Sequence, residues 1–197
     1  MTPTPNKADI TLAFDTSGAY CAAAVVHDGE LLGATSEPMK RGQSERLMSL
    51  MQELLAAHGL TWQDLSRVGV GIGPGNFTGI RIAVSTARGL ALSLGVPVIG
   101  VSTFEATLLD KPAGSTALVA APREQVYVLE AGHDVRLDEA ANWQHAHMPP
   151  CPNTLVENIA RIAAMAPADA PMPAPLYIKP ADAAPASDPP PVILDDA

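Results

Sequence analysis

The sequence predicts an α/β fold built around a mixed β-sheet that begins with an antiparallel meander. Apolar residues make up 47% of the 197 positions, which is enough to form a buried core. Residues 10–35 contain short apolar runs separated by turn residues, and residues 43–101 alternate between helix-type and strand-type patterns. This order places hairpin-connected strands first and helix-connected strands after them.

Three strands are expected at the N-terminus, over residues 10–16, 20–27 and 30–35. The turns between them contain Ser17-Gly18 and Asp28-Gly29, and Asp-Gly is a strong signal for a two-residue hairpin. Because both connections are short, we expect neighbouring strands to run antiparallel.

An amphipathic helix is expected next, with Ser44 as its N-cap and Gly59 just beyond its end. Its apolar stripe consists of Leu47, Met48, Met51, Leu54 and Leu55. A second helix is expected over residues 80–94, between buried strands over residues 67–72 and 96–101. A strand–helix–strand unit of this length makes its two strands parallel.

After residue 104 the pattern weakens. Residues 117–121 and 126–130 are expected to form a hairpin, and a short helix is expected over residues 154–164 with Thr154 as its cap and Glu157 completing a capping box. Twelve of the 19 prolines follow residue 148. The expected division is an N-terminal lobe over residues 1–104, a small second lobe over residues 105–178 and a mobile Pro/Ala-rich tail over residues 179–197.

Charge and cysteine content exclude several function classes. The chain has 12 Lys and Arg against 21 Asp and Glu, a net charge of −9, which argues against direct binding to nucleic acid or to an anionic membrane. Two cysteines, Cys21 and Cys151, cannot form a disulfide framework or a cysteine-based zinc site. Neither a membrane span nor a signal core stands out, so a soluble cytoplasmic protein is expected.

Asp15 is the first candidate for chemistry, because it ends the first strand beside the Thr-Ser-Gly turn. A carboxylate at the C-terminal end of a strand can hold a metal ion near bound phosphates. The alternative is a structural role, in which Asp15 accepts hydrogen bonds from the amides of the turn. The sequence leaves both interpretations open.

The glycine-rich turn GPGNFTG (73–79) is the second candidate. Its position between a strand and a helix N-terminus could aim backbone N–H groups of Gly73, Gly75 and Gly79 at an anion. It is neither a Walker A loop nor a GxGxxG fingerprint. The alternative is a tight turn for close packing, with Phe77 tucked into a neighbouring element. The histidines are scattered and no G-x-S-x-G motif is present, so we expect no metal site and no hydrolase triad.

Four stretches carry a resemblance to a known family: LAFDTS (12–17), QSERLMSLMQELL (43–55), VGVGIGPGNFTGIRIAVSTARGLAL (68–92) and PVIGVSTFEA (97–106). They resemble the TsaB family, also called YeaZ, and the GPG-x-FTG-x-R run followed by a helix of small residues is specific to it. Weaker echoes at residues 123–128 and 177–185 resemble its second lobe and C-terminal end. Where the family usually has Asp-Ala-Arg, this chain has Ala-Pro-Arg at residues 121–123.

The resemblance implies an actin-like ATPase fold (ASKHA, ribonuclease-H-like) with a reduced second lobe. It also implies a dimerisation subunit that pairs with the catalytic paralogue TsaD and with the ATPase TsaE. That complex transfers threonylcarbamoyl to N6 of adenosine 37 in tRNAs that read ANN codons, so this subunit would meet tRNA only indirectly. A homodimer of the isolated subunit is a further option.

The resemblance also implies that this subunit has no catalytic residue and binds no metal. The catalytic paralogue carries a His-x-x-x-His metal pair on its first helix, where this chain has Gln43 and Leu47. No cofactor of its own is implied, and ATP or ADP at the interface with the partner subunit is the option left open. The rival interpretation is an enzyme, either an actin-like ATP-dependent kinase or ATPase, or a peptidase-like protein.

A partner surface is expected on the two helices, because the first helix has more apolar residues than one buried stripe needs. The candidate interface residues are Leu47, Leu50, Met51, Leu54, Phe77, Ile80, Arg81 and Val84. A charge at Leu50 or Met51, whichever is exposed, is expected to abolish association with little effect on the folded monomer.

Overall fold

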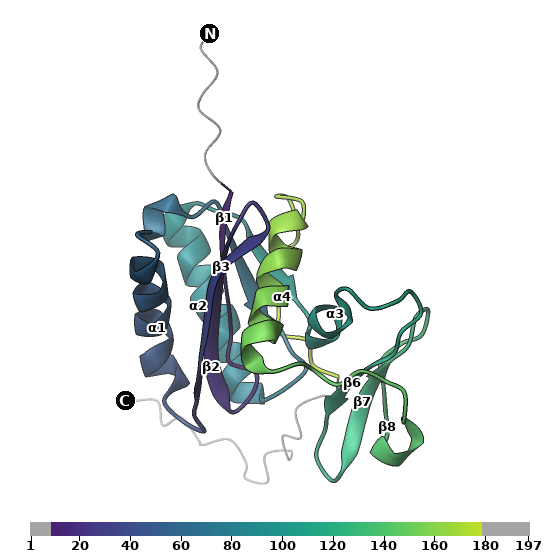
Figure 1. The fold of residues 1–197 in the computed structure, drawn as a ribbon. Coiled ribbons are helices and arrows are strands. Elements are labelled where there is room, and N and C mark those ends of the chain that lie inside the picture. Colours follow the sequence, from purple (N-terminus) through teal and green to yellow (C-terminus); the bar gives the residue numbers. More distant parts are fainter. Residues whose placement is uncertain (1–8, 179–197) are drawn as a thin grey trace, which may run out of the picture.

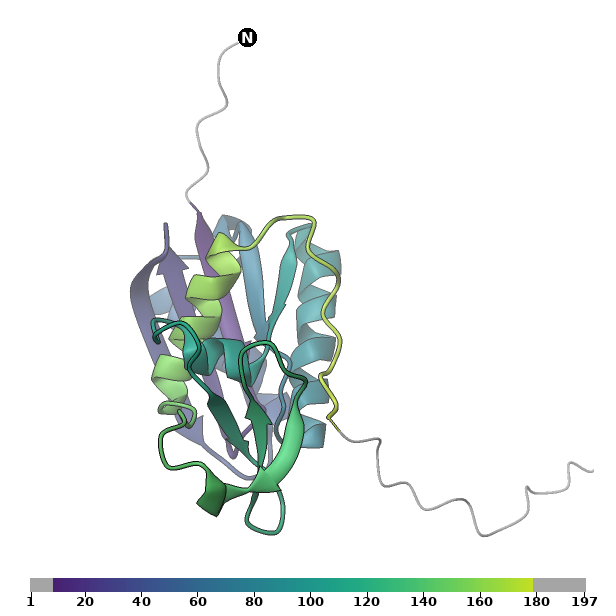
Figure 2. The ribbon, with the colours of Figure 1, turned by 90° about the vertical axis from the view of Figure 1, so that its right-hand side faces the viewer.

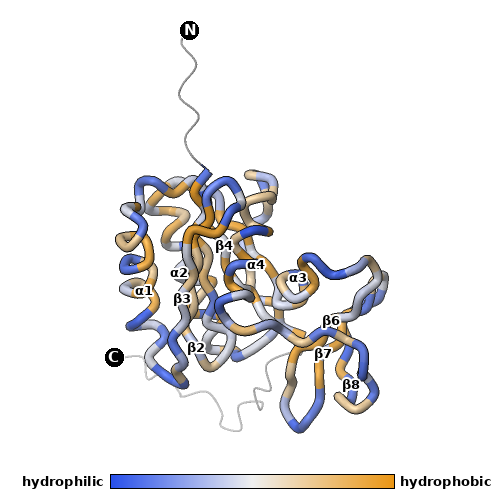
Figure 3. Tube along the Cα trace, in the orientation of Figure 1, coloured by the Kyte–Doolittle hydropathy of each residue, from blue (hydrophilic) through white to orange (hydrophobic). Residues whose placement is uncertain are grey.

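The main body of the fold is a five-stranded mixed sheet with helices on both faces, and a three-stranded sheet lies beside it (Figure 1). The computed structural model describes residues 9–178, so the tail expected over residues 179–197 lies outside the described residues. Figure 3 shows apolar segments gathered in the strands of the main body and hydrophilic segments at many of the turns. No helix within residues 9–178 has the length and apolar character needed to cross a bilayer.

The large sheet has the strand order β3-β2-β1-β4-β5. Its strands are β1 (Ile10–Asp15), β2 (Tyr20–His27), β3 (Glu30–Pro38), β4 (Arg67–Gly71) and β5 (Val98–Val101). The first three strands pair antiparallel, and β1, β4 and β5 pair parallel. The expected meander and parallel strands are therefore confirmed. This is the strand order of the actin-like, ribonuclease-H-like fold, so the predicted fold class is also confirmed.

Helices cover the two faces of this sheet (Figure 2). The helices are α1 (Gln43–Ala57), α2 (Phe77–Leu94), α3 (Thr103–Leu108) and α4 (Pro152–Met165), with short 3₁₀ turns at η1 (Trp62–Asp64) and η2 (Ala140–Asn142). Apolar side chains of α1 and α2 pack with one face of the sheet, and those of α4 pack with the other. Alternate residues of β1 and β2 therefore enter different cores, as the strand period of two requires.

Two helices begin earlier than their sequence patterns predict. Helix α1 begins at Gln43, and its N-cap is Gly42, which has a positive φ of 89°. The predicted cap Ser44 instead donates its hydroxyl to the Glu45 carboxylate. Helix α2 begins at Phe77, because the side chain of Asn76 accepts the Gly79 amide and caps the first turn. The glycine-rich turn and the helix thus overlap.

The start of α4 also differs from its prediction. Cys151 takes the N-cap position and Pro152 the first helical position, where a missing amide hydrogen costs nothing. Thr154 lies inside the helix, and its hydroxyl contacts the Cys151 thiol at 3.3 Å rather than capping a backbone amide. The capping box expected at Thr154 and Glu157 is therefore wrong.

The small sheet has the antiparallel order β6-β7-β8, with β6 (Ala117–Ala120), β7 (Gln125–Leu129) and β8 (Arg136–Glu139). The hairpin expected from the sequence is confirmed by β6 and β7. Strand β8 has the sequence RLDE and no alternating apolar pattern, so the sequence did not indicate it.

The packing crosses residue 104, where the sequence predicts the boundary between the N-terminal lobe and the second lobe. Helix α4 lies late in the chain but packs on β1, β2 and β4, with its buried side chains in the second core of the large sheet. After α4, the chain runs back along α2 as an extended segment, residues 166–178 (Figure 2). We call this segment the strap. The Leu176 amide donates to the Ile72 carbonyl at 2.8 Å, and the Arg88 guanidinium donates to the Pro173 carbonyl at 2.7 and 2.9 Å.

Candidate functional site

The turn after β1 and the glycine-rich turn before α2 are packed against each other. The Asn76 amide donates to the Ser17 carbonyl at 2.6 Å, and the Thr16 hydroxyl donates to the Gly79 carbonyl at 2.7 Å. The structure therefore brings together the two turns that the sequence singles out separately, at the C-terminal edge of the parallel strands.

The Asp15 carboxylate is enclosed by its own turn. The side chain is 1% exposed. It accepts hydrogen bonds from the Ser17 amide at 3.1 Å, from the Ser17 hydroxyl at 2.9 Å and from the Tyr20 hydroxyl at 2.5 Å. Burial raises the pKa of Asp15 above its ordinary value, against the lowering effect of these hydrogen bonds. Burial and the neighbouring Asp15 charge also raise the pKa of Tyr20. This environment matches the structural role considered for Asp15.

The glycines of the second turn make room for the backbone of the first. A Cβ atom at Gly75 would lie 2.5 Å from the Ser17 carbonyl oxygen, and one at Gly79 would clash with the Thr16 carbonyl oxygen. Gly73 has a positive φ of 95°, a conformation that side chains disfavour. Close packing accounts for these glycines without a bound anion.

Phe77 lies on the surface rather than inside a neighbouring element, and it is 40% exposed. The Arg81 guanidinium stacks 3.8 Å above its ring. The ring of Tyr177, on the strap, lies 5.1 Å from the Phe77 ring, and its hydroxyl accepts a 2.8 Å hydrogen bond from Arg81 Nε. Sequence reasoning missed this contact because residues 81 and 177 are far apart in the sequence, and they meet only because the strap folds back along α2.

Most of the expected partner surface is inside the protein. Six of the eight candidate residues are buried, namely Leu47, Leu50, Met51, Leu54, Ile80 and Val84. Because neither Leu50 nor Met51 is exposed, the proposed charge substitution has no surface site at these positions. The wide apolar arc of α1 is covered by β2, by β3 and by the neighbouring α2. Of the eight, Phe77 and Arg81 remain on the surface.

The two positions compared with the histidine pair of the catalytic paralogue are used for packing. Leu47 is fully buried in the core beneath α1, and the Gln43 side chain donates to the Met39 carbonyl at 3.4 Å. Within residues 9–178, no three His, Cys, Asp or Glu side chains are grouped in a way that could hold a metal ion.

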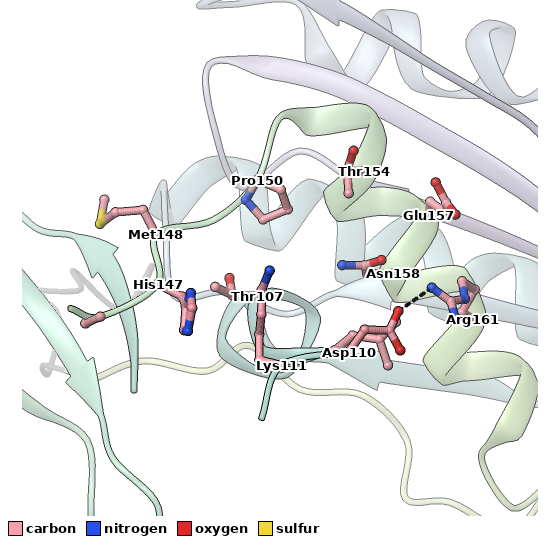
Figure 4. Close-up of a pocket in the computed structure, with 12 residues that line it drawn as sticks. Thr107, Asp110, Lys111, His147, Met148, Pro150, Thr154, Glu157, Asn158 and Arg161 are labelled. Carbon is pink, nitrogen blue, oxygen red and sulfur yellow. Dashed lines mark hydrogen bonds and ion pairs between the residues drawn. The ribbon is translucent and has the colours of Figure 1, made fainter. Parts of the chain in front are cut away.

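A second candidate site is a cavity of about 500 Å³ between α3, α4 and the segment leading into α4 (Figure 4). Its polar lining includes Thr107, Lys111, His147, Glu157 and Asn158. An ion pair of 2.8 Å between Asp110 and Arg161 closes one side. The sequence did not indicate this cavity, because its walls come from three separate segments.

Comparison with known proteins identifies the family. The family model described as TsaD, tRNA N6-adenosine threonylcarbamoyltransferase, matches residues 31–148. The solved structure of YeaZ from Pseudomonas aeruginosa is 30% identical, with a TM-score of 0.53, and the match covers 72% of this chain and 68% of that chain. This chain belongs to the TsaD-type family, in its TsaB (YeaZ) group. The predicted family is confirmed.

Other TsaB relatives match about half of the chain. The Escherichia coli protein, named tRNA threonylcarbamoyladenosine biosynthesis protein TsaB, is 39% identical over 93 residues, which are 47% of this chain and 40% of that protein. The Bacillus subtilis TsaB is 36% identical over 94 residues, covering 48% and 41%. The matched region therefore makes up less than half of the length of each of these TsaB relatives.

Proposed function

We propose that this chain is a non-catalytic accessory subunit of the machinery that forms threonylcarbamoyladenosine in tRNA. In this role it pairs with the catalytic paralogue TsaD, acts together with the ATPase TsaE, and supports threonylcarbamoyl transfer to N6 of adenosine 37 in tRNAs that read ANN codons. It would act in the cytoplasm, where tRNA is modified. The names of its TsaB relatives support the pathway.

The enclosed Asp15 carboxylate is the observation that carries the non-catalytic role. An acidic group that serves a bound metal must offer it free oxygen lone pairs. At Asp15, the turn and Tyr20 already supply three hydrogen-bond donors. Gly75 and Gly79 let the neighbouring turn pack closely against Ser17 and Thr16, which follow Asp15. Gln43 and Leu47, at the positions of the histidine pair, add support because both serve packing.

The charge of the chain supports indirect contact with tRNA. A net charge of −9 repels a phosphate backbone, so the RNA would be held by the partners. We propose that the chain alone holds no nucleotide, and that ATP or ADP would bind only where partner residues complete a site. Phe77 and Arg81 are the surface residues that we assign to the partner contact, since Phe and Arg are enriched in protein interfaces.

Co-expression with TsaD from the same organism tests this function. We expect a stable heterodimer, and we expect Arg81→Glu to weaken it more than Arg123→Glu. Arg123 is a matched control because it is also exposed and lies at the β6–β7 turn. The isolated chain should neither hydrolyse ATP nor cleave peptides. Sustained turnover by the purified chain would favour the rival enzyme interpretation, and failure to pair with TsaD would contradict the proposal.

A further inference from the structure

The cavity between α3, α4 and the segment leading into α4 includes buried polar residues in its lining. Its volume of about 500 Å³ is typical of small-molecule sites. Asn158 is 8% exposed and Thr107 is 2% exposed. The Asn158 amide nitrogen donates to the Ala106 carbonyl at 2.7 Å, and the Thr107 hydroxyl donates to the Thr103 carbonyl at 2.6 Å. These hydrogen bonds fix the two side chains before any ligand arrives.

One acceptor of this lining has no donor. Asn158 Oδ1 accepts no hydrogen bond from any residue in the described part of the chain, although the residue is more than nine-tenths buried. Polar atoms of buried side chains are normally hydrogen-bonded, because an unmade bond costs free energy. Since Asn158 lines the cavity, a donor for this oxygen can come from a molecule bound there.

Two opposite charges line the same cavity without pairing. Lys111 follows α3 and Glu157 lies on α4, and both are lining residues. Within residues 9–178, neither side chain forms an ion pair or a hydrogen bond. In Figure 4, Asn158 is drawn between Lys111 and Glu157. The other two charges of the lining, on Asp110 and Arg161, pair with each other at 2.8 Å.

This arrangement of charges favours a ligand that carries both signs. Lys111 attracts an anionic group, and Glu157 attracts a cationic group and repels a phosphate. No Phe, Tyr or Trp is among the described residues that line the cavity, so the lining offers no such ring for stacking a nucleobase. Leu109, Met148 and Pro150 add apolar surface to the lining, which suits an aliphatic group.

We propose that this cavity binds a free α-amino acid with an aliphatic side chain. The carboxylate of the ligand pairs with Lys111, and its ammonium group donates to the Glu157 carboxylate and to Asn158 Oδ1. The aliphatic side chain packs on Leu109 and Met148. A simple amine or a simple carboxylic acid would satisfy only one of the two free charges. This binding goes beyond the proposed function, since it requires neither TsaD nor tRNA.

Titration of the isotope-labelled full chain with L-leucine tests the proposal by NMR. We expect saturable shifts of the Lys111 backbone amide and of the Asn158 side-chain amide. Lys111→Met and Glu157→Gln should each weaken binding about tenfold or more, because each removes a hydrogen bond between charged groups. Lys40→Met and Glu124→Gln are matched controls, since each removes an exposed charge of the same sign outside the cavity lining, and both should bind L-leucine as the wild type does.

Three further ligands test the need for both charges. The first is 3-methylbutylamine, which lacks the carboxylate, the second is 4-methylpentanoate, which lacks the ammonium group, and the third is inorganic phosphate. Each should bind at least about tenfold more weakly than L-leucine. Comparison of the standard L-amino acids then gives the side-chain preference, which we expect to favour aliphatic residues.

Several results would overturn the proposal. They are the absence of a saturable shift with every standard L-amino acid at millimolar concentration, equal binding of the amine, the acid or phosphate, and unchanged affinity in both Lys111→Met and Glu157→Gln. Each of these results would leave pairing with TsaD unaffected, so failure of the proposal is distinct from failure of the proposed function.

Discussion

The Thr16 hydroxyl donates a 2.7 Å hydrogen bond to the Gly79 carbonyl, 63 residues further along the chain. This bond and the contact of Asn76 with Ser17 join the end of β1 to the start of α2. One side-chain and one backbone hydrogen bond thus hold the two turns together.

Gly79→Ala is expected to destabilise the protein. The new methyl group would clash with the Thr16 carbonyl oxygen, and forced overpacking of this kind costs about 1–3 kcal/mol. The matched control is Gly89→Ala in the same helix, where a Cβ atom has open space and should stabilise by roughly 0.5–1 kcal/mol. Urea denaturation measures both variants. Equal effects of the two substitutions would contradict the packing role of Gly79.

The pH dependence of stability should contain a contribution from Asp15. Burial raises the pKa of this carboxyl above its ordinary value of 3.8, so the folded state binds the proton more tightly than the unfolded chain. This contribution to the free energy of unfolding is therefore largest at low pH, and it is lost as the pH rises from about 3.8 through the folded pKa. Asp15→Asn cannot titrate, so its unfolding free energy should lack this decline. Denaturation curves of both proteins across this range make the comparison, and identical slopes would refute the assignment.

The sequence predicted the large sheet well, because the meander and the strand–helix–strand unit are local patterns. Hairpin turns at Ser17-Gly18 and Asp28-Gly29 determine which strands pair. The position of α4 could not be predicted in this way. An amphipathic helix shows that it needs an apolar surface, but its sequence does not specify which sheet supplies that surface.

Leu50→Glu should unfold the chain rather than only block association. Leu50 is 2% exposed in the core beneath α1, and a buried carboxylate without a partner costs several kcal/mol. Met48→Glu is the control on the same helix, since Met48 is 42% exposed and its substitution should change stability by no more than about 0.5 kcal/mol. Circular dichroism melting distinguishes the two. A Leu50→Glu variant with the melting temperature of the wild type would contradict the described core.

Arg88→Ala should loosen the strap. The guanidinium makes two hydrogen bonds to the Pro173 carbonyl, and hydrogen bonds from a charged group contribute about 1.5–3 kcal/mol. Amide hydrogen exchange should therefore accelerate at Leu176, whose amide donates to Ile72, while β1 keeps its protection. Lys111→Ala is the control, because this cation has no carboxylate partner within the described residues. Unchanged exchange at Leu176 in Arg88→Ala would show that the strap is held by other contacts.

The candidate site was only partly accessible to sequence reasoning. The motif around Asp15 and the glycine-rich turn were recognised, but two interpretations of each remained open. The two interpretations are distinguished by the direction in which each side chain points and by the hydrogen-bond donors around it. At Asp15, one such donor is the Tyr20 hydroxyl. Likewise, amphipathic periodicity overstated the free surface of α1, because it does not reveal that α2 lies alongside.

The central claim is that this chain supports catalysis by TsaD without performing chemistry at Asp15. Mass spectrometry of tRNA after reconstitution with TsaD, TsaE and a threonylcarbamoyl donor tests it most directly. We expect threonylcarbamoyladenosine when the chain and TsaD are both present, none when TsaD is omitted, and an undiminished yield with folded Asp15→Asn. Product without TsaD, or loss of product with a folded Asp15→Asn chain, would contradict the account.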